Sequence, residues 1–186
     1  MATLSPAPQL HVAPTAKPIT LAEAKAHCRV DHTDDDALID ALIDAAVAYL
    51  DGWGGVLGRA IMPQEWRQEF GGWGDLPLAL PDVASDPAPV VEGFDSADAA
   101  VAATVSDLVK TAGGWVLVTE GPAVDRVRVT YTCGLPAVRL PAAKALIKLM
   151  VGYWYGNRGD AAGAALAGDI PPEAAGLLRA LRAVRI

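Results

Sequence analysis

The side chains best suited to chemistry gather in one acidic cluster at residues 31–36, which reads Asp-His-Thr-Asp-Asp-Asp. A calcium-binding loop needs oxygen ligands at alternate positions, a glycine at its sixth position and a glutamate at its twelfth. Counted from Asp31, those two positions hold Asp36 and Leu42. The spacing therefore favours helix capping and a solvated acidic face. A small-molecule hydrolase or metal-dependent enzyme that uses Asp34 to Asp36 is the enzymatic alternative.

Other catalytic and cofactor motifs are missing from the sequence. No serine lies in a G-x-S-x-G turn, and the three histidines share no metal-ligand spacing with a cysteine or glutamate. The glycine-rich runs at 52–55 and 71–74 lack the Lys-Ser/Thr pair of a phosphate loop, so we expect turns there. Cys28 and Cys133 form no C-x-x-C pair and are expected to be small buried side chains. The sequence predicts no enzyme, no cofactor and no metal.

Composition limits the possible partners. The chain has 186 residues, a hydrophobic content of 52% and a formal net charge of −7. This length fits one domain, and the acidic balance disfavours direct binding to a phosphate backbone. No apolar run approaches the roughly 20 residues that span a bilayer, and prolines interrupt the N-terminal region where a signal peptide would be apolar. We expect a soluble protein that does not contact a membrane.

The N-terminal third predicts an arm and two helices. Residues 1–18 hold four prolines and no apolar period, which indicates an extended arm, either disordered or ordered by a neighbour. Thr20 and Glu23 have capping-box spacing, which predicts a helix to about Cys28. The next helix should begin near Thr33 or Asp34 and stop near Gly52. Its apolar stripe repeats every three to four residues and comprises Leu38, Ile39, Leu42, Ile43, Ala46, Val47 and Leu50.

The middle of the chain, at about 64–132, predicts β-structure. Trp66, Gln68 and Phe70 should share one strand face, residues 76–80 form an edge segment, and firmer strands are expected at 115–119 and 124–131. The last of these alternates valine or tyrosine with arginine or threonine, so one face should be buried. Residues 82–113 are rich in Ala, Asp and Ser, and we expect loop excursions there.

Helices return towards the C-terminus. Pro141 predicts the start of a mostly apolar, central buried helix that ends at Gly156 and Asn157, and Pro172 starts a final amphipathic, locally basic helix. The fold class is thus α+β: mainly a helical bundle formed from both chain ends, with a central β-rich insertion. The candidate interaction residues are Leu178, Arg179, Leu181, Arg182 and Arg185 on the final helix, and Trp53 and Trp73 in the glycine-rich turns. The two tryptophans could instead pack on the helices.

Several segments together resemble a known family, the head-tail connector (adaptor, head-completion) proteins of long-tailed phages, prophages and gene transfer agents. The order and spacing of the segments over nearly the whole chain carry the resemblance. They are the runs at residues 19–25, 29–31, 34–39, 49–50, 58–60, 127–131, 134–136, 140–146 and 153–158, which read ITLAEAK, RVD, DDDALI, YL, GRA, VRVTY, GLP, LPAAKAL and YWYGNR. Two departures are the Ala-rich stretch at 84–112 and Cys28, which stands where the family commonly has leucine.

The resemblance implies a structural subunit of the virion, without catalytic residues, that is assembled in the bacterial cytoplasm. It implies a ring of copies, commonly a dodecamer, under the portal protein at the head-tail junction. A tail-side completion or stopper protein would be the next partner, and DNA would only pass through the channel. Within this scheme residues 1–18 are the arm and 19–158 the connector domain with its insertion. Residues 159–186 are a linker and a portal-docking helix. A small acidic module that uses its basic terminal helix on a host protein is the alternative.

Overall fold

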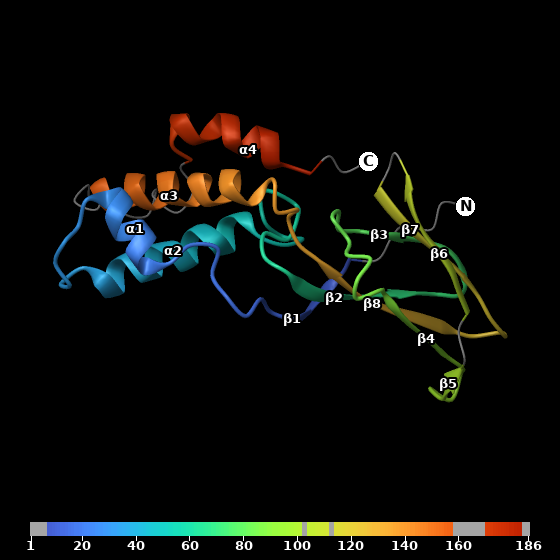
Figure 1. Cartoon of the computed structure of the whole chain (residues 1–186). Helices are drawn as coiled ribbons and strands as arrows, with labels where there is room; N and C mark the ends of the chain where they lie inside the picture. Colours follow the sequence, from blue (N-terminus) through green and yellow to red (C-terminus); the bar gives the residue numbers. More distant parts are fainter. Residues whose placement is uncertain (1–6, 102–103, 112–113, 158–169, 184–186) are drawn as a thin grey trace. The chain divides into compact units, whose positions relative to one another are not determined.

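The computed structural model describes residues 7–101, 104–111, 114–157 and 170–183. Over these residues the protein combines four α-helices, one 3-10 turn and two antiparallel sheets, which confirms the mixed α+β class (Figure 1). The chain divides into two compact units. Of the described residues, the helical unit comprises 16–61, 136–157 and 170–183, and the β unit comprises 7–15, 62–101, 104–111 and 114–135.

The helical unit begins with the two predicted N-terminal helices. Helix α1 spans Leu21–Cys28, and its Thr20 hydroxyl accepts from the Glu23 amide while the Glu23 carboxylate accepts from the Thr20 amide, as the capping box predicts. Helix α2 spans Asp36–Leu50 and buries the inner half of its predicted stripe. Leu38 lies at the edge of that stripe and stays 40% exposed. Cys28 is only half-buried, in contrast to the buried position that we expected.

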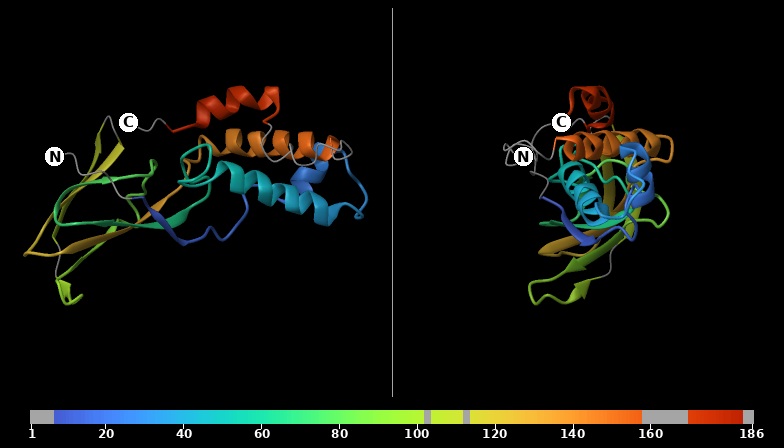
Figure 2. Two further views of the ribbon diagram at one scale, coloured as in Figure 1. Left: turned by 180° about the vertical axis from the view of Figure 1, so that it is seen from behind. Right: turned by 90° about the vertical axis from the view of Figure 1, so that its left-hand side faces the viewer.

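Helix α3, Leu140–Gly156, is the centre of the helical unit. It packs against α1 and α2 on one side and against the C-terminal 3-10 turn η1, Pro172–Ala174, and helix α4, Ala175–Leu181, on the other (Figure 2). The predicted C-cap is Asn157, whose side-chain amide donates to the Tyr153 carbonyl. The side chains that α3 buries are Ala143, Leu146, Ile147, Met150, Val151 and Trp154.

A compact loop at residues 51–61 follows α2 and contains the first glycine-rich run. Its backbone folds back on the end of α2: the Val56 amide donates to the Tyr49 carbonyl, and the Leu57 amide to the Leu50 carbonyl. Leu57, Ala60 and Ile61 are at most 1% exposed, so the loop is part of the core of this unit. The Gly55 position is the tightest, because a Cβ there would lie 2.2 Å from the Asp51 carbonyl oxygen.

The β unit contains two sheets. Sheet A has the order β1-β2-β8-β4-β5 and sheet B the order β3-β7-β6. The strands of sheet A are β1 (Gln9–Val12), β2 (Gln64–Phe70), β8 (Arg126–Cys133), β4 (Val90–Phe94) and β5 (Ala100–Val101). Those of sheet B are β3 (Gly74–Leu78), β7 (Gly114–Glu120) and β6 (Thr104–Thr111). The predicted edge position of β3, which contains Pro77, is confirmed.

Alternation along the strands separates a buried face from a wet face. On β2 the residues Trp66, Gln68 and Phe70 are buried, and on β8 the buried set includes Val127, Val129 and Tyr131, as predicted for both strands. Leu76, Leu78 and Leu117 supply the inner face of sheet B. Gln68 links the two sheets: its amide nitrogen donates to the Pro77 carbonyl at 3.2 Å, and its amide oxygen accepts from the Ala79 amide and the Tyr131 hydroxyl.

Two expectations for this unit need correction. Residues 82–113 were expected to be loop excursions, but β4, β5 and β6 lie there. These strands have few large apolar groups, and β4 and β6 are stabilised by pairing with β8, which buries one apolar face, and with the more apolar β7. The extended arm also contains regular structure, because Gln9–Val12 pairs antiparallel with β2 and so becomes an edge strand, β1.

We predict that Gly55→Ala destabilises the helical unit by about 1–3 kcal/mol, because the added methyl group overlaps fixed backbone atoms of α2. Urea unfolding followed by circular dichroism at 222 nm measures the change. Gly54→Ala is the matched control, since its Cβ meets no atom within 4 Å and should alter stability by less than about 0.5 kcal/mol. Equal losses in the two variants would contradict the packing described for residues 51–61.

Candidate functional site

The predicted docking residues lie on or beside α4, which packs against α3. Arg179 and Arg182 are exposed and Leu178 is half-buried, whereas Leu181 is only 2% exposed. The end of this helix is held by the Ala183 amide, which donates to the Leu57 carbonyl at 2.8 Å. Arg185 lies outside the described residues. The outer side of α4 therefore presents two arginines, while Leu181 fastens the helix to the core.

The two candidate tryptophans lie in different units. Trp53 is half-buried in the loop at 51–61 of the helical unit. Trp73 belongs to the connection between β2 and β3, where its indole nitrogen donates to the Pro122 carbonyl at 2.6 Å. Its ring fits against Gly93 and Gly121: a Cβ at either position would come within 2.5–2.7 Å of the ring. Trp73 thus has a packing role inside the β unit.

Two residues of the acidic cluster at 31–36 form polar contacts with helices α1 and α3. Asp36 pairs with Lys25 of α1, and the Tyr155 hydroxyl of α3 donates to Asp35. Asp35 occupies the N-cap position of α2, yet its side chain makes no capping hydrogen bond, so the predicted capping role is replaced by this contact with α3. No group of three or more potential metal-ligating side chains occurs among the described residues.

Two further clusters of ion pairs, one around Lys17 and one around Glu23, extend this pattern in the helical unit. Lys17 contacts the carboxylates of Asp40 at 2.8 Å and Asp44 at 2.7 Å, and hydrogen bonds to both raise the pKa of its ammonium group. Glu23 lies within 3.8 Å of both Lys144 and Lys148 on α3. The hydrogen bond from the Thr20 amide, followed by these two lysines, lowers the pKa of Glu23 below its ordinary value of 4.5. The acidic face of α2 is thus partly neutralised by the chain itself.

A charged ladder, undetected from the sequence, covers the outer face of sheet A. Arg126 pairs with Glu69 at 2.8 Å and also with Asp98, while Arg128 reaches Glu69 at 3.2 Å and Glu92 at 3.9 Å. Both guanidinium groups lie within 5 Å of the Phe94 ring centroid. The alternating arginines of β8 were visible in the sequence, but their carboxylate partners follow only from strand register. This face is an internally neutralised surface and not a free cationic patch.

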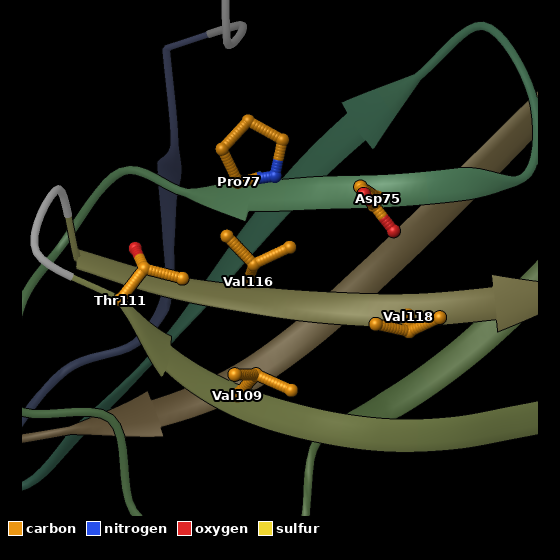
Figure 3. Close-up of a pocket in the computed structure, with 6 residues that line it drawn as sticks. All are labelled: Asp75, Pro77, Val109, Thr111, Val116 and Val118. Atoms are coloured by element: carbon orange, nitrogen blue, oxygen red, sulfur yellow. The ribbon is translucent and has the colours of Figure 1, made fainter.

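The outer face of sheet B carries an apolar hollow that sequence reasoning also missed. It has a volume of about 390 Å³ and is lined by Asp75 and Pro77 of β3, Val116 and Val118 of β7, and Val109 and Thr111 of β6. Figure 3 shows these six side chains on three adjacent strands. Register places Pro77, Val116 and Val109 in one row across the sheet and Asp75, Val118 and Asp107 in the next. If β6 had been predicted as a strand, the valines that β6 and β7 place on one solvated face would have indicated this hollow.

The polar groups that the structure brings together among the described residues hold secondary-structure elements against one another. Tyr131 is the most perturbed titratable group: burial raises its pKa, and its hydroxyl donates to Gln68 inside the β unit, where it serves packing. No described helix is both long enough and apolar enough to cross a membrane. The surfaces with features of recognition sites are the basic side of α4 and the hollow on sheet B.

The chain is similar to a known protein family and to a solved structure. Residues 18–69 match the family model described as "Phage gp6-like head-tail connector protein", which confirms the resemblance inferred from the sequence. No curated protein matches the chain significantly. A chain in the solved structure "Neck of empty GTA particle computed with C6 symmetry" has the same fold, with a TM-score of 0.66 at 22% identity over 97% of both chains.

We predict that Glu23→Gln lowers stability at neutral pH, because it removes the ion pairs of Glu23 with Lys144 and Lys148. The loss should be only a few tenths of a kcal/mol, because these ion pairs are solvated and screened. A carboxylate with a lowered folded-state pKa contributes stability above its unfolded pKa, and that contribution is lost as pH falls through the folded value. The melting temperatures of the two proteins, measured from pH 7 to pH 3, should therefore converge as the pH falls through the folded-state pKa of Glu23. If the difference in stability between the two proteins stayed constant over this pH range, the ionised Glu23 carboxylate would not be its cause.

We also predict that Gly121→Ala destabilises the β unit by about 1–3 kcal/mol, because its methyl group would displace the Trp73 ring from its hydrogen bond. Near-ultraviolet circular dichroism should lose tryptophan signal in parallel. Gly71→Ala, at a position with open space, is the control and should melt like the unchanged protein. If Gly121→Ala also melted unchanged, Trp73 would be free for the interface role first considered.

Proposed function

We propose that this chain is a structural head-tail connector subunit that joins the DNA-filled head of a tailed phage or phage-like particle to its tail. The observation that carries the proposal is the agreement of the connector family match at 18–69 with a fold match that covers 97% of the chain. The similar chain belongs to the neck of a gene transfer agent particle. The protein would accordingly be located at the head-tail junction of the virion and act without catalysis.

The subunit would work as one member of a ring. The similar neck was computed with C6 symmetry, which is compatible with the twelve copies that the family resemblance implies. In this proposal the helices from both chain segments form the bundle of the connector domain, and residues 64–132 form its insertion. The β unit would face a tail-side completion or stopper protein, and DNA would only pass through the channel, where the net charge of −7 disfavours its adhesion.

The portal protein would be bound by the outer side of α4. Arg179 lies on α4 and Arg182 is the residue that caps its C-terminal end, and both are exposed. Leu178 would add apolar contact, and the buried Leu181 would hold α4 in place without touching the partner. Residues 159–186 would thus serve as the linker and docking segment.

We predict that the intact chain binds its portal protein in a fixed ring stoichiometry, and that truncation after Gly168 abolishes this binding. Arg179→Glu combined with Arg182→Glu should weaken binding at least tenfold, since each arginine would lose a charge-assisted contact worth about 1.5–3 kcal/mol. The matched Arg179→Lys, Arg182→Lys variant keeps the charge and should retain most of the affinity. Mass measurement of the complexes provides the readout.

The outcomes separate the parts of this proposal. If no form binds the portal protein, the connector function is refuted. If the truncated chain binds as well as the intact chain, the connector function stands and the docking segment is wrong. If the lysine variant loses as much affinity as the glutamate variant, the contact depends on guanidinium geometry and not on charge alone.

A further inference from the structure

The hollow on sheet B combines an exposed apolar floor with negative charge at one end, as the surface of a protein interface would. Its floor is apolar, with Val116 and Val118 on the central strand and Val109 of β6 still 38% exposed beside them. Asp75 and Asp107 lie in the row of Val118 and give one end of the hollow negative charge. Both aspartates are exposed, and neither makes an ion pair among the described residues. A fitting partner would present an apolar side chain beside a cation.

The same chain carries such a group just before α3. Val138 is 86% exposed, more than any other large apolar side chain that the structure describes. It lies in a tight turn in which the Arg139 amide donates to the Pro136 carbonyl at 2.8 Å. Arg139 is exposed as well and makes no ion pair with another described residue. The turn at 136–139 is therefore a small apolar projection with an adjacent, available positive charge.

We propose that the turn at 136–139 of one copy docks into the hollow on sheet B of the next copy. Val138 would cover the valine floor, and Arg139 would face Asp75 and Asp107. The inference rests on the proposed ring, because a closed ring needs two different surfaces of one subunit that complement each other. Burial of apolar area would supply attraction, and the charge pair would fix the register of the contact.

Charge complementarity is the reason for choosing a second copy as the occupant. Seven large apolar side chains are exposed among the described residues, and Val138 is the one followed directly by an arginine. The edge of β3 at the hollow contains Pro77, which lacks an amide donor and makes addition of a further strand there unfavourable. A compact projection therefore suits this site better than an extended peptide.

Cross-linking between two singly labelled chains tests the proposal. On a Cys28→Ser background, which leaves only the fully buried Cys133, one chain carries Val138→Cys and the other Val116→Cys. The mixture is oxidised mildly, both alone at high concentration and with the portal protein. Val138→Cys mixed with Val90→Cys is the control, because Val90 is a 58% exposed valine on sheet A and reacts at least as readily in random collisions. We expect at least fivefold more disulfide-linked dimer from the first mixture.

Charge reversal then tests the register. Asp75→Arg in the Val116→Cys chain, or Arg139→Asp in the Val138→Cys chain, should each reduce the cross-link at least threefold, and the two together should restore it. Cross-linking no greater than in the control, in both conditions, would overturn the interface. Portal binding by the unchanged chain, measured in parallel, reports on the connector function separately, so either proposal can fail while the other stands. Thermal melts confirm that each variant is folded.

Discussion

Helix α3 is the element on which the rest of the structure depends. It contacts α1, α2 and α4, yet the β unit separates it in sequence from the first two. Forming these contacts requires closure of a loop of more than 70 residues, whose entropic cost grows only slowly with length. The fully buried side chains of α3, among them Leu146, Ile147 and Met150, offset that cost. The polar contacts of Asp35 and Glu23 with α3 then define how the helices align.

The sequence of the β unit can interrupt that of the helical unit because the two ends of the interrupting segment lie side by side. Strands β2 and β8 pair antiparallel from Gln64 opposite Cys133 to Phe70 opposite Val127, so the chain enters and leaves at one place. Gly134 is required there, since a Cβ would lie 2.9 Å from the Pro63 nitrogen. An insertion closed in this manner places little strain on the helices.

Local signals predicted the helices well, and tertiary pairing explains the failures. Thr20 and Glu23 are a capping signal readable within four residues, and the α2 stripe has a clear period, so both were correct. Strand β4 was missed because it pairs with β8, which is distant in sequence, and β6 was missed because it has few large apolar side chains although its partner β7 follows it closely. The same reason hid the Arg126 ladder and the hollow on sheet B, which exist only once register aligns separate strands. Trp73 was predicted as a possible interface residue for the same reason, because Gly93 and Gly121, against which its ring packs, are distant in sequence.

Each unit holds one surface with features of a recognition site: the basic side of α4 in the helical unit, and the hollow on sheet B in the β unit. The proposed connector function would require such surfaces. The most direct test is electron microscopy of particles made without this protein. The account predicts DNA-filled heads and separate tails, with joining restored when the purified chain is supplied. Intact head-tail particles in its absence would contradict it.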